Sequence, residues 1–572
     1  MRKLFFIVTL VGLLSASFAF IFISFIDSRS TGQLTVDPGH SSLYIKNSDL
    51  TVLGQDKDGV TYFFLPSYAE MNYLIQDESG AKIYLADGSL LSDPLFGEVQ
   101  PVNIDLGNGE VIPWFISFMR SDNLYTLDID LRGANVSDIS HDIYMPSGIS
   151  LYSRYGKLEC RDESVLIKGR GNTTWNAAKQ PYEIKLSERF PMCGLESSSK
   201  WVLLANFFDD TKILNKMAMD LSADMDMGYA IESDWIDLYI NGEYRGNYLI
   251  CKEPGIGNGR LRTNEGFLVE KDIRADPNEK DAIFKVDSNV FRIKDPLPLT
   301  SEASDEIASY VSEISDSIHT MSGGDLPASI DRYSFIRRFM IDELFNNPDT
   351  MQTSYYFYRQ SDTLYAGPCW DYDLSCGKSL NGMDFYDYSR SILDDMSEDC
   401  LDWDPVLLAN EIYRHEYAAA FAEYMPLFND LLETRIDSYA KKISASLEMD
   451  RALWQNDEIP VRFYSDAGNK YRFIKFYLYK RMQLLASYCG YNAALPDISL
   501  NKSETHSVTF VTENGSSSLD VSDGTLLSEK DLPDYDHTRF SGWKYQREDK
   551  PFSHFLPVYE DISLELMPIP PT

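Results

Sequence analysis

The stretch that decides the fold is acidic and lies in the middle of the chain. It reads Asp342-Glu343-Leu344-Phe345-Asn346-Asn347-Pro348-Asp349 and, further on, Gly367-Pro368-Cys369-Trp370-Asp371-Tyr372-Asp373. Three of its carboxylates, Asp349, Asp371 and Asp373, could bind a divalent metal through oxygen, with one left to accept a proton. Capping of helices and turns is the alternative, and the residues alone leave both open.

A glycine-containing segment lies upstream, where Lys168-Gly169-Arg170-Gly171-Asn172 follows the apolar run Val165-Leu166-Ile167. Its glycines let the backbone approach a ligand, and its basic side chains supply charge, so it could hold phosphate. Lys185 follows on an alternating strand, on the face opposite Ile184, where a lysine suits phosphate contact. A tight hairpin and a solvated edge charge are the alternatives.

Together these segments resemble the CotH (spore coat protein H) kinase family. Members carry Gly-Arg-Gly-Asn-Ser-Thr-Trp, matched by residues 169–175, and Lys-Pro-Tyr-x-x-Lys-Leu, matched by residues 180–186, with Thr173 and Gln180 as the two differences. Further matches are Trp-x-Leu-Leu-Ala-Asn at residues 201–206, an Asn-Gly hairpin at residues 237–249 and a strand at residues 266–272. The acidic stretch follows the family pattern Glu-Leu-x-x-Asn-x-Asp and Gly-Pro-x-Trp-Asp-x-Asp, and the match spans about residues 145–495.

The resemblance implies an atypical protein-kinase fold that binds ATP with Mg²⁺ or Mn²⁺ and transfers the γ-phosphoryl group to protein hydroxyls. Asp349 would orient or deprotonate the acceptor hydroxyl, and Asp371 would hold the metal with help from Asp373. Candidate nucleotide contacts are Lys185, Arg170, Gly171 and Asn172. Motif positions expected to support the site are Asn347, Ser354 and Glu270.

Two other functions stay open. A cell-surface adhesion or interaction protein could keep a kinase-like scaffold without turnover, and a glycosidase would also use two carboxylates. Nothing else in the sequence supports the glycosidase, and retention of all three acidic positions favours the kinase.

The predicted fold class is α+β, with strands up to about residue 295 and helices from about Glu302. A two-lobed kinase-like domain at 145–495 follows a β-sandwich-like domain at 49–140. Residues 505–572, with Phe540-Ser541-Gly542-Trp543, resemble the internalin-type B repeat, a β-grasp module of bacterial surface proteins. The resemblance implies a spacer or adhesive module, with a surface or cell-wall ligand as a possible partner.

The N-terminus and the charge bear on location and partners. Residues 4–26 are uncharged and follow Arg2 and Lys3, so residues 1–27 are predicted to be a signal anchor, 28–48 a linker and the rest extracytoplasmic. Cleavage, and hence secretion, is the alternative. The net charge of −36 argues against nucleic acid as a partner, and an unidentified protein substrate is expected.

Overall fold

The computed structural model describes residues 43–46, 51–69, 75–77, 82–91, 95–105, 111–257, 260–261, 266–275, 282–321, 325–377, 387–397, 400–454, 464–496, 498, 500–547 and 549–569. The chain divides into two compact units. The first takes its described residues from Met1–Leu65 and Glu70–Met119, and the second from Pro66–Ala69 and Arg120–Thr572.

The first unit consists of two sheets, whose strand orders are β2-β1-β5 and β3-β4-β8-β7-β6. Their bounds are β1 Leu43–Lys46, β2 Thr51–Leu53, β3 Gln55–Lys57, β4 Val60–Leu65, β5 Ile75–Asp77, β6 Lys82–Leu85, β7 Val99–Asp105 and β8 Val111–Arg120. Alternation along β7 buries Val102 and Ile104 and exposes Val99, as expected for a sheet with one covered face.

The second unit begins with a closed barrel of strand order β10-β11-β12-β13-β15-β14-β9. The bounds are β9 Tyr125–Asp130, β10 Met145–Tyr152, β11 Leu158–Gly169, β12 Tyr182–Phe190, β13 Ser198–Leu204, β14 Ser233–Ile240 and β15 Glu243–Cys251. Every second residue points inward, so Ile167 and Ile184 join the barrel core while Lys185 is exposed. The predicted orientation of Lys185 relative to Ile184 is therefore confirmed.

Two details of the barrel bear on the sequence predictions. Asn241 and Gly242 join β14 to β15 with φ of 52° and 82°, which confirms the expected type I′ turn. Strand β9 pairs with β10 and, in parallel, with β14. Because β9 closes the barrel, the division falls at Arg120 rather than near residue 140.

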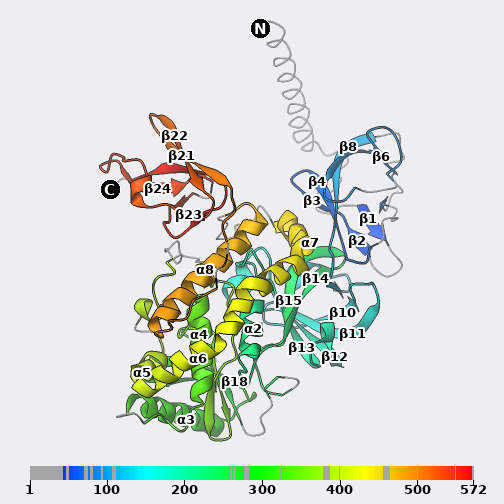
Figure 1. The fold of residues 1–572 in the computed structure, drawn as a ribbon. Coiled ribbons are helices and arrows are strands. Elements are labelled where there is room, and N and C mark those ends of the chain that lie inside the picture. Colours follow the sequence, from blue (N-terminus) through cyan, green and yellow to red (C-terminus); the bar gives the residue numbers. More distant parts are fainter. Residues whose placement is uncertain are drawn as a thin grey trace. The chain divides into compact units, whose positions relative to one another are not determined.

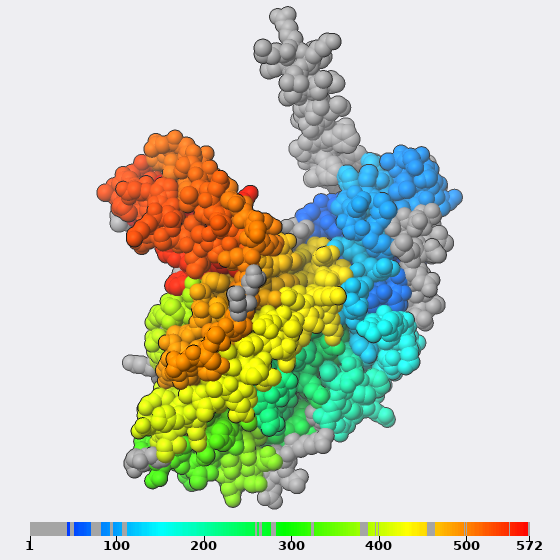
Figure 2. Space-filling view, in the orientation of Figure 1, coloured from blue at the N-terminus to red at the C-terminus, as the bar shows by residue number. Residues whose placement is uncertain are grey.

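A second, five-stranded sheet of order β17-β18-β16-β19-β20 packs with the helices of this unit. Its strands are β16 Leu268–Lys271, β17 Ile283–Val286, β18 Asn289–Asp295, β19 Tyr355–Gln360 and β20 Thr363–Ala366. The helices are α2 Leu214–Asp224, α3 Ser301–His319, α4 Arg332–Phe345, α5 Trp403–Ala409, α6 Glu411–Asp430, α7 Ile436–Trp454 and α8 Ala467–Tyr488, with a π-turn, η6 Leu431–Arg435, between α6 and α7. Figure 1 shows this succession of elements, with α6 and α7 following one another end to end through η6, and Figure 2 shows the orange α8 beside this yellow run on one face. The predicted α+β class is confirmed, while the two-lobed kinase-like description stays a prediction.

The C-terminal part of this unit is a five-stranded sheet, β22-β21-β27-β24-β25, with a two-stranded sheet, β23-β26. The bounds are β21 Thr505–Thr512, β22 Gly515–Ser522, β23 Thr525–Leu526, β24 Phe540–Tyr545, β25 Lys550–Pro551, β26 Pro557–Val558 and β27 Ile562–Pro568. Trp543 of the quoted motif is buried against Phe510, with ring centroids 5.3 Å apart. The resemblance to the internalin-type B repeat stays a prediction.

The expected membrane location needs correction. Within the described ranges, no helix is both long and apolar enough to cross a bilayer. The predicted single-pass membrane localisation is therefore not supported and is withdrawn. Residues 4–26, from which it was argued, lie outside the described residues. Of the predicted linker at 28–48, the structure describes residues 43–46, which form strand β1 rather than a linker.

Candidate functional site

The turn that follows α4 positions Asp349. The helix ends at Phe345, and Asn346 takes the left-handed conformation, with φ of 48°, that reverses the chain. Buried Asn347 accepts a hydrogen bond on Oδ1 from the Asp349 amide at 3.2 Å. The side chain of Asn347 therefore holds the turn that carries Asp349, and its supporting role in function stays a prediction.

The loop after β20 carries Asp371. Its backbone is held by α2, since the Tyr372 amide donates to Asn215 Oδ1 at 2.7 Å, and by α4, since Arg338 donates to the Pro368 carbonyl at 2.7 Å. Asp371 itself has φ of 68°, and Ser354 donates from Oγ to its Oδ2 at 3.1 Å. Two motifs that lie apart in the sequence are therefore joined at one carboxylate.

Asp349 and Asp371 lie close enough to influence each other electrostatically. Burial and then the negative charge of Asp371 raise the pKa of Asp349 to about 7, against the opposing effect of Arg274. The guanidinium of Arg274 lies 3.7 Å from Asp349 Oδ1, and the Asp349 side chain is 15% exposed. Asp272 adds a third negative charge, and its Oδ1 accepts from Thr353 at 3.0 Å. The site is a nearly buried concentration of negative charge, with Arg274 beside Asp349 and Arg292 3.4 Å from Asp272.

The third predicted ligand, Asp373, is buried, with 6% exposure. It does not complete a ready three-carboxylate cage. In the part of the chain that the structure describes, one group of three or more metal-ligating side chains has its ligand atoms within 4.8 Å of one another, and that group lies elsewhere, at Glu504, His506 and Asp523.

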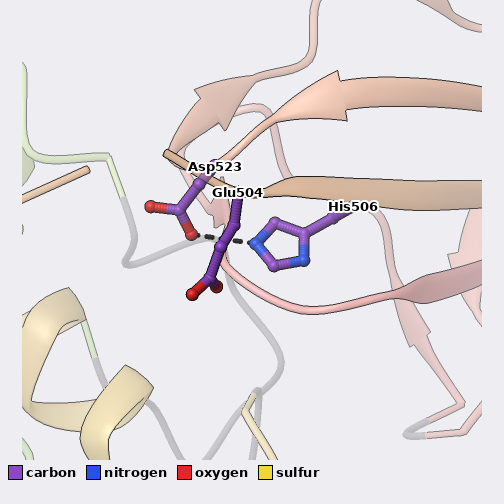
Figure 3. A group of neighbouring side chains, drawn as sticks. All are labelled: Glu504, His506 and Asp523. Carbon is purple, nitrogen blue, oxygen red and sulfur yellow. Dashed lines mark hydrogen bonds and ion pairs between the residues drawn. The ribbon is translucent and has the colours of Figure 1, made fainter. Parts of the chain in front are cut away.

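The side chains of Glu504, His506 and Asp523 lie side by side, with a hydrogen bond between His506 and Asp523 (Figure 3). Asp523 is fully buried, forms an ion pair with Arg472 of α8, and accepts from His506 Nε2 at 2.9 Å. Its Oδ2 also accepts from the Lys502 amide at 2.5 Å. With both oxygens already engaged, Asp523 acts as a structural anchor rather than an open metal ligand.

Arg170 supplies positive charge beside the acidic loop. Its guanidinium carbon lies 5.4 Å from the centroid of the Trp370 ring, next to Asp371 in sequence. Its Nε is buried and has no hydrogen-bond partner among the described residues. An unpartnered buried N–H is costly, so a ligand oxygen at this position would satisfy it.

A chain of alternating charges extends from Arg170 across the second sheet. Although burial opposes ionisation, Lys294, Lys200 and Arg170 hold the pKa of Glu253 down at about 2. Lys294 also lies 3.3 Å from Glu270, whose pKa burial raises. The predicted supporting residue Glu270 therefore belongs to this chain of charges, in which each ion has an opposite neighbour.

The remaining predicted nucleotide contacts lie at the barrel. Lys185 is exposed and is the cross-strand neighbour of Lys200, and it is Lys200 that contacts Glu253, at 2.6 Å. Gly171 has φ of 83°, which a residue with a side chain rarely adopts, and the Asn172 side chain is exposed. Among the four predicted nucleotide contacts, Arg170 is the one with a described contact to the acidic loop, at Trp370.

Sequence reasoning missed several members of the site: Lys200, Glu253, Asp272, Arg274, Lys294 and Trp370. Asp272 and Trp370 belong to matched motifs and could have been named on that ground. Lys294 and Arg274 carried no such signal, because strand register and loop geometry bring them to the site.

A comparison with protein families bears on this geometry. A family model described as CotH kinase protein matches residues 167–485, more than half of the chain. The chain belongs to the CotH kinase family. The matched range contains every predicted site residue, from Arg170 to Asp373, and supports a kinase-like function for this CotH-family chain. No curated protein matches the sequence.

Proposed function

We propose that this CotH-family chain is an atypical protein kinase that transfers the γ-phosphoryl group of ATP to a hydroxyl group of a protein substrate. The observation that carries the proposal is the pair Asp349 and Asp371, in which burial and then the charge of Asp371 raise the pKa of Asp349 to about 7. Two carboxylates held together in this way are stabilised by a bound cation, and ATP is bound in cells with one.

The residues present fit a divalent cation with nucleotide phosphates. Carboxylate oxygens of Asp371 and Asp373 are the hard ligands that Mg²⁺ and Mn²⁺ prefer, and Mg²⁺ commonly takes one or two carboxylates together with substrate phosphates. When bound, such an ion would neutralise phosphate charge and orient the transferred group. The unpartnered Nε of Arg170, which lies beside Trp370, fits an anionic ligand such as a phosphate.

Asp349 has the properties expected of the group that receives the proton of the acceptor hydroxyl. With a pKa of about 7 it is ionised in a substantial fraction of molecules at neutral pH and is still basic enough to take a proton. Asn347 fixes its backbone, and Arg274 stands beside its carboxylate. Asp349 is therefore assigned to orient the acceptor hydroxyl, and its burial makes its carboxylate more basic than usual.

The phosphates are assigned to Arg170, Gly171 and Asn172, with Lys185 as a further cation on the outer face of the barrel. Arg170 is placed by its contact with Trp370, and Glu253 with Lys294 continues the line of charge behind it. Positioning and charge stabilisation are what phosphoryl transfer requires.

Transfer of label from [γ-³²P]ATP to general acceptor proteins, with Mg²⁺ or Mn²⁺, tests the proposal. We expect wild type to label an acceptor and Asp349→Asn to lose about 100-fold or more in rate. Asp362→Asn is the matched control, because Asp362 is fully exposed. ATP binding without transfer by the wild-type chain would instead support the non-catalytic interaction protein, and would overturn the kinase.

A further inference from the structure

The segment of residues 169–175, here called the glycine loop, depends on close packing at its two glycines. A Cβ at Gly169 would lie 2.2 Å from the Trp175 ring, and one at Gly171 would lie 2.3 Å from Thr174 Oγ1. The turn η3, Thr173–Asn176, closes the loop. Its own side chains therefore fill the inner side of the loop, and its backbone has little freedom there.

A short segment that precedes β10 supports the glycine loop from outside. The Gly169 amide donates to the Ser140 carbonyl at 2.8 Å, and His141 Nε2 lies 2.8 Å from the Gly171 carbonyl oxygen. The His141 ring also packs at 5.5 Å from the Trp175 ring. Residues 140 and 141 thus contact the loop at its start, its middle and its tryptophan.

The chemistry of these contacts fixes the role of the His141 ring. A carbonyl oxygen only accepts, so Nε2 must carry the proton for the contact with Gly171 to be a hydrogen bond. Nδ1 lies 2.6 Å from the Asp142 carboxylate, which also accepts when ionised. Asp142 is therefore a charged neighbour in contact with the ring, while the turn η3 that faces it carries no charged residue.

We propose that His141 is a positioning residue for the nucleotide phosphates, acting through the Gly171–Asn172 peptide. In a planar trans peptide the N–H points opposite to the C=O, so holding the Gly171 carbonyl on His141 turns the Asn172 N–H away from His141. Within the described ranges that N–H makes no hydrogen bond, which leaves it for a phosphate oxygen. The inference rests on the proposed function, and His141 lies outside the residues that the family model matches.

Two substitutions in the full chain distinguish loss of the Nε2 hydrogen-bond donor from loss of the volume of the His141 side chain. The amide nitrogen of Gln reaches the position of Nε2, whereas that of Asn reaches only the position of Nδ1. We expect His141→Gln to keep wild-type affinity for ATP with Mg²⁺ and His141→Asn to weaken it about three- to tenfold, the worth of one hydrogen bond. His554→Asn is the control for a His-to-Asn change away from the glycine loop, because His554 Nδ1 contacts the Leu527 carbonyl in the C-terminal sheets at 2.9 Å, and ATP affinity should not change.

The nitrogen-15 shifts of the His141 ring give a second readout that does not depend on nucleotide, with the signal assigned by its loss in His141→Gln. A protonated Nε2 is expected, and an unprotonated Nε2 would overturn the inference. Equal ATP affinity of wild type and His141→Asn would overturn it while leaving the proposed function intact. Absence of ATP binding by wild type would overturn both.

Discussion

Replacing Asp349 by Asn should stabilise the ligand-free chain, by an amount that grows with pH. The pKa of Asp349 is about 7 against an ordinary 3.8, and each pH unit of the difference is worth about 1.4 kcal/mol. Between these values the folded chain keeps a proton that the unfolded chain has released, so raising the pH favours unfolding. Wild type therefore loses up to about 4 kcal/mol from this carboxyl between pH 4 and pH 8, and Asp349→Asn loses none of it.

Thermal unfolding of both chains from pH 4 to pH 8 without divalent cations measures this difference. The two transitions should nearly coincide at pH 4 and separate by about 4 °C at pH 8, with the variant higher, for a unit of this size. Asp362→Asn, at an exposed position, should follow wild type at every pH. Adding Mn²⁺ should narrow the gap, because only wild type keeps both carboxylates. A gap that does not change with pH would refute the electrostatic argument.

Three further predictions concern the surroundings of the site. Gly169→Ala places a methyl group 2.2 Å from the Trp175 ring, so it should lower the free energy of unfolding, measured in urea, by about 1–3 kcal/mol. Adding Trp175→Leu to the same chain should restore most of this loss. No loss in the single variant would contradict the packing. Arg472→Ala leaves buried Asp523 without its arginine, so it should cost about 3–5 kcal/mol and expose the C-terminal sheets to limited proteolysis. Arg539→Ala, which breaks an exposed pair with Glu513, should change stability far less, because solvent screens that pair. Lys294→Met leaves Glu270 without its ion-pair partner, while Glu253 keeps Lys200. The change should cost about 3 kcal/mol at pH 7 in denaturant titration, and less at lower pH, because the pKa of Glu270, already raised by burial, rises further without the lysine. An equal loss at both pH values would count against the charge chain.

Local sequence patterns predicted much of the fold. The alternation of Ile184 and Lys185 correctly predicted which strand face is buried, and Asn241-Gly242 predicted the turn between β14 and β15. Helix α3 begins at Ser301, close to the expected start of the helical part, but α2 at Leu214–Asp224 precedes it and strands β19 and β20 follow it, so the expected division into strands and then helices is incomplete. These features depend on neighbours in sequence, which is why they could be predicted.

Features set by distant pairing could not be predicted in this way. The barrel closes because β9 pairs in parallel with β14, with Tyr125 opposite Ile236, and no local period shows that register. The charge chain likewise arises because β16 lies between β18 and β19, which brings Lys294 to Glu270. The carboxylates of the site were therefore predicted, because they lie in sequence motifs. Residues such as Lys294 were missed, because strand pairing brings them to their partners.

The loop of Asp371 is proposed to bind ATP together with a divalent cation. Calorimetric titration of the full chain with ATP, with and without Mg²⁺ or Mn²⁺, tests it most directly, with Asp371→Ala beside wild type. We expect metal-dependent binding by wild type and its loss in Asp371→Ala, because the Asp371 carboxylate, which accepts a hydrogen bond from Ser354, is the group assigned to the metal. Binding that is absent from folded wild type, or unchanged in Asp371→Ala, would contradict it.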